Sequence, residues 1–150
     1  MINAGTLDTL VDLARQAAEK AGLHLRRLAD ERLGAEQQLA MLHSYRQDYM
    51  LRLQNTIENG VSASNYQNFR RFIDTLDAAI LQQNKALAHM EGRIRESQRH
   101  WNERQRQLNA YEALATRRQC LVRDRQARAE QRLYDEAAAN AYRRHLHPLS

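Results

Sequence analysis

The sequence is poor in the residues that end helices and in those that build large cores. Its 150 residues contain five glycines and a single proline, Pro148. Because proline lacks the backbone N–H that a helix requires, no residue from Ile2 to His147 breaks a helix in this way. Aromatic residues make up only 6% of the chain, and the mean hydropathy is −0.79. This composition leaves too little apolar bulk for a conventional layered core.

Cysteine and long apolar runs are also nearly absent. Cys120 is the only cysteine, so no internal disulfide is possible, and a reducing, cytosolic location is favoured. No stretch approaches the roughly 20 apolar residues of a membrane span, and no signal peptide opens the chain. The net charge of +5 leaves nucleic acid, acidic lipid and acidic protein surfaces as possible partners.

What the sequence does contain is two long heptad patterns. Apolar side chains that repeat every 3.5 residues form a narrow stripe along a helix, and such a stripe is typical of packing against one partner helix. The first pattern consists of Leu7, Val11, Ala14, Ala18, Ala21, Leu25, Leu28, Arg32, Ala35, Leu39, Leu42, Arg46, Tyr49 and Leu53. The second consists of Ile73, Leu76, Ile80, Gln83, Leu87, Met90, Ile94, Ser97, Trp101, Arg104, Leu108, Tyr111 and Ala115.

These two patterns predict an all-α protein, a long antiparallel two-helix coiled-coil hairpin with a longer second helix. We expect helix one over about 6–57, a turn over about 58–63 and helix two over about 64–144, together forming a single domain over residues 1–150. Folding the chain back at the turn places Leu7 near Leu114 or Ala115. Residues from about Arg117 onward then have no partner in their own chain.

Capping residues support these boundaries. Thr6 is a candidate cap for the first helix, and Gly60 can take the left-handed conformation that ends a helix. Ser62 or Ser64 begins the second helix, and Ser64 with Gln67 has the spacing of a capping box.

Polar residues interrupt both stripes and are expected to fix the register of the two helices. Arg46 is predicted to pair with Asp74 or Asp77. Near the turn, Tyr45, Tyr49 and Leu53 are expected to pack against the densest apolar group of the sequence, which consists of Tyr66, Phe69, Phe72, Ile73 and Leu76.

The far part of helix two is chemically distinct because eleven arginines stand against five acids between Arg93 and Arg132. Three interpretations remain open: a solvated helix face, a face that docks on an acidic protein surface, and a nucleic-acid contact. The arginines are Arg93, Arg95, Arg99, Arg104, Arg106, Arg117, Arg118, Arg123, Arg125, Arg128 and Arg132.

The sequence holds no convincing catalytic, metal or cofactor site. His145 and His147 lie at the C-terminal end without nearby carboxylates, and the other histidines are scattered. Cys120 has no base at a suitable spacing, and the glycines form no phosphate-binding loop. We therefore expect a protein that is not an enzyme and binds no cofactor.

The sequence resembles the family of the flagellar export protein FliJ. The resemblance rests first on Ile57-Glu58-Asn59-Gly60-Val61 followed by Tyr66, Phe69, Ile73 and Leu76. It rests further on Trp101, Tyr111-Glu112-Ala113-Leu114, Arg117-Arg118 and Asp135-Glu136-Ala137-Ala138. It covers nearly the whole chain.

The resemblance implies a cytosolic component of the flagellar type III export apparatus, peripherally associated with the inner membrane. Such a protein is expected to act as a stalk that regulates the hexameric export ATPase ring. It is also expected to contact the cytoplasmic domain of the export gate and to escort export chaperones.

The resemblance further suggests which residues make these contacts. The ATPase-facing role falls on Arg117, Arg118, Arg123, Arg125, Arg128, Asp135 and Glu136. A gate-binding surface on the outer face of helix one is expected at Asp12, Arg15, Gln16, Glu19 and Lys20.

Two alternatives share the same architecture. One is the equivalent stalk of an injectisome-type secretion system. The other is a basic coiled-coil scaffold that binds nucleic acid or an anionic membrane, although aromatic residues for stacking are sparse among the arginines.

Overall fold

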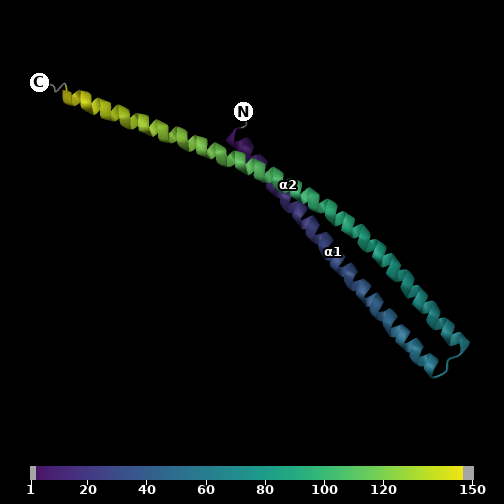
Figure 1. Cartoon of the computed structure of the whole chain (residues 1–150). Coiled ribbons are helices and arrows are strands. Elements are labelled where there is room, and N and C mark those ends of the chain that lie inside the picture. The colour runs from purple at the N-terminus through teal and green to yellow at the C-terminus, as the bar shows by residue number, and fades with distance from the viewer. Residues whose placement is uncertain (1–2, 147–150) are drawn as a thin grey trace. The chain divides into compact units, whose positions relative to one another are not determined.

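The computed structural model describes residues 3–146 and contains two α-helices, α1 (Ala4–Glu58) and α2 (Ala63–Leu146). α1 has 55 residues and α2 has 84. The described part of the chain contains no strand. The prediction of an all-α hairpin with a longer second helix is thereby confirmed (Figure 1).

The start of α1 differs from the prediction, because Asn3 rather than Thr6 caps the helix. The side-chain Oδ1 of Asn3 accepts a hydrogen bond of 2.7 Å from the backbone N–H of Thr6. The carbonyl of Asn3 accepts a second one of 3.0 Å from the N–H of Leu7. Asparagine is among the strongest N-capping residues because its side chain satisfies a free donor of the first turn. The helix therefore begins two residues earlier than expected.

The turn is built around Gly60, as the sequence predicts. Gly60 has a φ of +83°, a conformation that glycine adopts without the steric penalty of a Cβ. Its N–H donates to the carbonyl of Ile57 at 3.2 Å, and the N–H of Asn59 donates to the carbonyl of Asn55 at 3.1 Å. These bonds satisfy carbonyls that the end of α1 would otherwise leave free.

Of the two candidate serines, Ser62 caps α2. Its Oγ accepts a hydrogen bond of 3.2 Å from the N–H of Asn65, and its carbonyl accepts one of 3.0 Å from the N–H of Tyr66. Ser64 lies inside the helix, so the proposed capping box of Ser64 and Gln67 is not the start of α2. Ser62 is the cap because its side chain and its carbonyl accept hydrogen bonds from the N–H groups of Asn65 and Tyr66 in the first turn.

The chain divides into two compact units. The hairpin unit is Ala17–Arg104, and the terminal unit joins the residues up to Gln16 with those from Gln105 onward. The prediction of one domain over residues 1–150 stays a prediction.

The core of the hairpin unit follows the heptad positions. Every residue of the two heptad patterns, which together form the seam between the helices, is buried or half-buried from Ala18 to Arg104. Ile73 is the most buried, with 1% exposed. Near the turn, Tyr49 stacks on Phe72 with ring centroids 4.1 Å apart and meets Phe69 edge-on at 6.2 Å. Tyr45 is exposed instead. The aromatic group at the turn thus packs around Tyr49.

Two polar residues of the heptad patterns, Arg46 and Gln83, are paired across the two helices, in line with a role in setting register. Arg32 instead pairs with Glu36 on its own helix, and the buried Oγ of Ser97 has no hydrogen-bond partner among the described residues. Arg46 donates from Nε to Oδ1 of Asp77, so Asp77 rather than Asp74 is its partner. This hydrogen bond and the carboxylate charge raise the pKa of Arg46. Gln83 donates at 3.0 Å to the carbonyl of Ala35 on α1. A shift of one heptad would break both contacts.

Gly22 lets α1 and α2 approach closely. A Cβ placed on Gly22 would lie 3.1 Å from Nε1 of Trp101, whereas one on Gly34 would meet nothing within 4 Å. The indole therefore packs against backbone at a point where any side chain would push it away.

The terminal unit is paired only in its first part. Leu7, Val11 and Ala14 of α1 are buried together with Leu108 of α2. Every described residue of α2 from Gln119 to Leu146 is exposed, and we call this segment the extension. No helix in the described residues is long and apolar enough to cross a membrane.

Candidate partner-binding site

A groove opens where α1 begins and α2 continues beyond it. Figure 1 shows α2 running past the N-terminal end of α1 within the terminal unit. The groove has a volume of about 390 Å³ and contains four apolar side chains, Leu7, Leu114, Leu121 and Val122. Three arginines complete its lining, Arg117, Arg118 and Arg125. It therefore combines an apolar floor with a basic rim.

Pairing between the helices ends about where the sequence suggested. A second hollow, of about 360 Å³, is lined from α1 by Ala4 and Asp8 and from α2 by Val122 and Arg123. The expectation that pairing stops at about Arg117 agrees with the structure to within one turn, because Arg118 is half-buried and every described residue from Gln119 onward is exposed. The Asn3 cap lets α1 start at Ala4, so that the first turn of α1 lines this hollow. The predicted meeting of Leu7 with Leu114 and Ala115 is confirmed.

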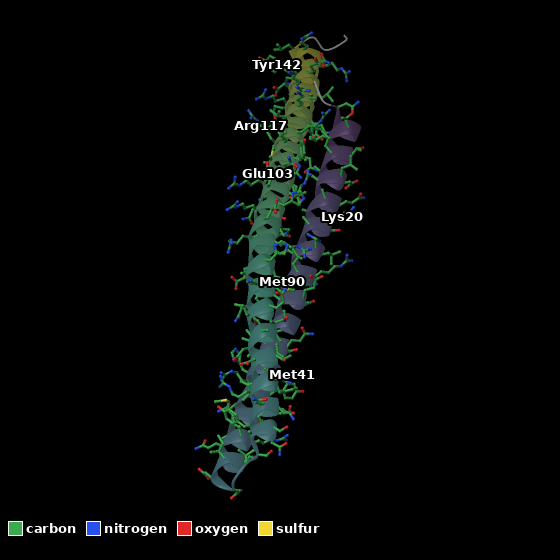
Figure 2. All side chains as sticks on the ribbon, turned by 90° about the vertical axis from the view of Figure 1, so that its right-hand side faces the viewer. Lys20, Met41, Met90, Glu103, Arg117 and Tyr142 are labelled. Atoms are coloured by element: carbon green, nitrogen blue, oxygen red, sulfur yellow. The ribbon has the colours of Figure 1, made fainter. Side chains whose placement is uncertain are left out.

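The residues expected to face an ATPase lie at two levels along α2. Figure 2 shows Arg117 near the N-terminal end of α1 and Tyr142 far beyond it. Residues at the level of the two hollows are Arg117, Arg118, Arg123 and Arg125. Arg128, Asp135 and Glu136 lie further out in the extension, where all side chains are exposed. Asp135 accepts a hydrogen bond of 3.2 Å from Gln131 one turn earlier.

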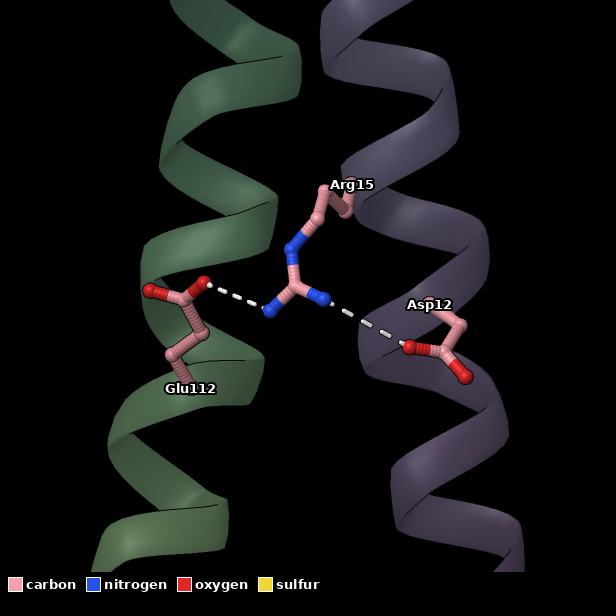
Figure 3. A network of polar contacts seen from close by, with 3 residues as sticks. All are labelled: Asp12, Arg15 and Glu112. Atoms are coloured by element: carbon pink, nitrogen blue, oxygen red, sulfur yellow. Dashed lines mark hydrogen bonds and ion pairs between the residues drawn. The ribbon is translucent and has the colours of Figure 1, made fainter.

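All five residues expected to bind the gate are exposed, but Arg15 also contacts the neighbouring helix. Arg15 reaches across to α2, with Nη2 3.5 Å from Oε1 of Glu112 and Nη1 3.6 Å from Oδ1 of Asp12 (Figure 3). Asp12 and Arg15 thus flank the helix contact, and the outer-face prediction is wrong for Arg15. Heptad position alone misplaced it, because a long arginine beside the seam can reach the neighbouring helix.

The other three residues expected to bind the gate differ in whether they lie beside α2. Lys20 lines a hollow of the hairpin unit together with His100 and Arg104, so it too lies beside α2. Gln16, Glu19 and Lys20 are all exposed. That these residues bind the export gate stays a prediction.

Among the described residues, no group of three or more His, Cys, Asp or Glu side chains could hold a metal ion. Cys120 is exposed. His145 is described, whereas His147 lies outside the described residues.

The sequence prediction did not identify Leu121 and Val122 as part of a groove, although both line it. The signal was present as a change of phase in the apolar pattern between Leu114 and Leu121. Its meaning depends on where α1 begins, which the sequence placed two residues too late. The floor of the groove could not be identified without that boundary.

Fold and surface together define a class of helical-hairpin protein in which the second helix is the longer and continues into an exposed, arginine-rich extension. A family model for the flagellar FliJ protein matches residues 3–147. The chain belongs to the flagellar FliJ family, and this membership implies a component of the flagellar export apparatus. The resemblance noted in the sequence is confirmed.

Individual relatives agree. The flagellar FliJ proteins of Salmonella typhi and Escherichia coli are each 31% identical over 144 residues, which cover 94% of this chain and 96% of theirs. The flagellar FliJ protein of Buchnera aphidicola is 26% identical over 109 residues, covering 73% of this chain and 75% of its own. None of these names is that of an enzyme. No solved structure matches the chain.

Proposed function

We propose that this protein is a non-enzymatic stalk that docks into the flagellar export ATPase ring through the extension and regulates the ring. The observation that carries the proposal is the unequal length of the two helices. α2 continues past α1 as a helix whose described residues from Gln119 are all exposed. This segment is rich in arginine, and a single basic helix is narrow enough to enter the centre of a ring.

Physical chemistry supports a protein surface as the partner of the extension. An isolated helix is marginally stable in water because most helix stability in proteins comes from packing. Binding in a lumen would supply that packing. Arginine pairs with carboxylates through two parallel hydrogen bonds, so acidic loops that line a ring would hold it in place. The affinity should fall as salt rises, since exposed charges are screened.

The proposal is tested with the double variant Arg123→Glu/Arg128→Glu and purified export ATPase. We expect the wild-type chain to raise the hydrolysis rate and the hexamer fraction, and the variant to lose most of both effects. The reversal of two charges exchanges attraction for repulsion at the docking helix. Arg70→Glu/Arg71→Glu, with two exposed arginines of the hairpin unit, is the matched control and should behave as wild type. Equal stimulation by both variants would contradict the proposal.

Contacts with the export gate and with export chaperones belong to the same proposal. They are supported by the family and by the exposed residues Gln16 and Glu19. Inner-membrane association would then follow from the gate rather than from a spanning helix. A Gln16→Ala/Glu19→Ala variant, titrated with the gate's cytoplasmic domain, checks whether this face takes part. Unchanged affinity would remove these residues from the contact.

A further inference from the structure

We propose that the groove between Leu7 and Leu121 binds an acidic amphipathic helix of a partner protein, which lies along α2 where α1 stops. The inference concerns the groove, which includes the first part of the extension at Leu121, Val122 and Arg125, and not the residues further along α2. It stands whether or not the extension docks into the ATPase ring.

The apolar floor calls for a helix because it continues the stripe that α1 covers elsewhere. Steps of seven lead along α2 from Leu108 through Ala115 to Val122 and Ala129. Leu108 is buried and Ala115 is half-buried, whereas Val122 and Ala129 are exposed. α1 covers the first two positions and ends beside the third. The apolar stripe of α2 thus continues beyond the end of α1. A helix from another molecule could pack on this exposed part as α1 packs on the rest.

The exposed apolar surface is concentrated at one point. Leu114, Leu121 and Val122 are 47%, 51% and 43% exposed and meet in the same groove. Leu7 closes one end of the groove and is itself buried. Single exposed leucines are ordinary, but a cluster of them that lines a groove marks a binding surface.

The charge of the rim selects an acidic partner. Within the paired region, two arginines of α1 pair with acids of α2, Arg15 with Glu112 and Arg46 with Asp77. Arg117 and Arg125 flank the groove, yet neither forms an ion pair with any described residue. A partner helix with Glu or Asp beside its apolar stripe would supply the missing acids.

Other occupants fit less well. A second copy of the chain would bring another arginine-rich helix against the first, and like charges repel. Nucleic acid would engage the arginines but not the leucine and valine floor, because bases stack on aromatic side chains. The groove requires an occupant with apolar side chains for its floor and acidic side chains for its arginines, and an acidic amphipathic helix has both.

The site is short. From Leu114 to Ala129 the stripe extends roughly 22 Å at 1.5 Å per residue, which corresponds to about four turns of a partner helix. Such an interface lies at the small end of the range for specific complexes. Binding should therefore be weak and readily reversible.

The probe for the test is a designed 21-residue peptide with leucine at the a and d positions and glutamate at e and g. It carries a fluorescent label and is titrated with the full-length chain at low salt, with anisotropy as the readout. One control peptide has lysine in place of glutamate, and another has serine in place of leucine. We expect the acidic amphipathic peptide to bind at least about tenfold more tightly than either control.

Variants of the protein locate the site. Leu121→Asp should weaken binding at least about tenfold, because it places an acid in the apolar floor. Leu133→Asp, which changes a more exposed leucine of the same helix, should leave binding unchanged. Arg117→Glu/Arg125→Glu should reverse the preference, so that the lysine peptide binds better. Circular dichroism should show equal helix content in all variants, since the altered side chains are partly or fully exposed.

Four results would overturn the inference. They are equal binding of the acidic and basic peptides, unchanged binding by Leu121→Asp, displacement of the peptide by an oligonucleotide duplex, and self-association of the chain that Leu121→Asp abolishes. The first two would show that the groove is not the site. The last two would assign it to nucleic acid or to a second copy.

Discussion

The two halves of α2 differ in their surroundings as well as in their charge. In the hairpin unit, Ile73 and Leu76 of α2 are buried against α1, whereas Leu121 and Leu133 in the extension are exposed. Both halves belong to the same continuous helix, and both contain apolar residues. The comparison shows that an apolar repeat creates a core only where a partner helix is present. The length of α1, not the sequence of α2, decides which half is which.

Charged residues repeat the same contrast. Arg46 of the hairpin unit is bound to Asp77 on the other helix. Arg123, Arg125 and Arg128 of the extension form no ion pair with any described residue. Arg46 of α1 thus pairs with the other helix of its own chain, whereas these three arginines of the extension are exposed to solvent.

Hydrogen exchange should give the largest difference between the two halves. We expect backbone amides of residues 124–146 to exchange at least about 100-fold faster than those of residues 70–100, because a helix without a partner opens locally at little cost. Mass spectrometry of peptic fragments resolves the two segments. Equal protection in the free protein would mean that the extension is already covered.

Truncation of a side chain should separate the two halves energetically. Ile73→Ala is expected to lower the free energy of unfolding by about 2–4 kcal/mol, because it opens a cavity at the most buried position. Leu133→Ala, at a position that is 66% exposed, should change it by less than about 0.5 kcal/mol. Urea titration followed by circular dichroism measures both. Similar losses for the two variants would contradict the contrast in burial.

The smallest effects concern two glycines within α1. Gly34→Ala should stabilise the protein by about 0.5–1 kcal/mol, since alanine is the better helix former and the added methyl group meets nothing. Gly22→Val should destabilise it by about 1–2 kcal/mol because the new side chain displaces Trp101. Trp101 is the only tryptophan, so its fluorescence should change in the second variant alone. An unchanged spectrum in Gly22→Val would show that the two helices are not in close contact there.

Much of the fold followed from the heptad pattern. Each seam position from Leu7 to Leu53 and from Ile73 to Ala115 is buried or half-buried. The predicted turn at Gly60 and the meeting of Leu7 with Leu114 also agree with the structure. A repeat of 3.5 residues indicates which side of a helix faces its partner helix. One short turn then fixes which residues of the two helices lie opposite each other.

The rest depended on details that periodicity does not encode. The Asn3 cap involves a single side chain outside the repeat, and it moved the start of α1. Arg15 is not a heptad position, but its long side chain reaches Glu112 on the other helix. The close approach of Gly22 to Trp101 is a matter of how two helices meet in space. Each of these needed three-dimensional placement.

The Asn3 cap has a consequence for how this protein is handled and how its relatives should be compared. Each residue added to the start of α1 covers roughly 1.5 Å more of α2, so one further heptad would cover about 10 Å and close over Leu121. An affinity tag fused ahead of Asn3 would stand beside that surface and compete for it. A tag on the C-terminal side of the chain avoids this interference. Among relatives, the distance from the first helix cap to the turn measures how much of the long helix is left for others to bind.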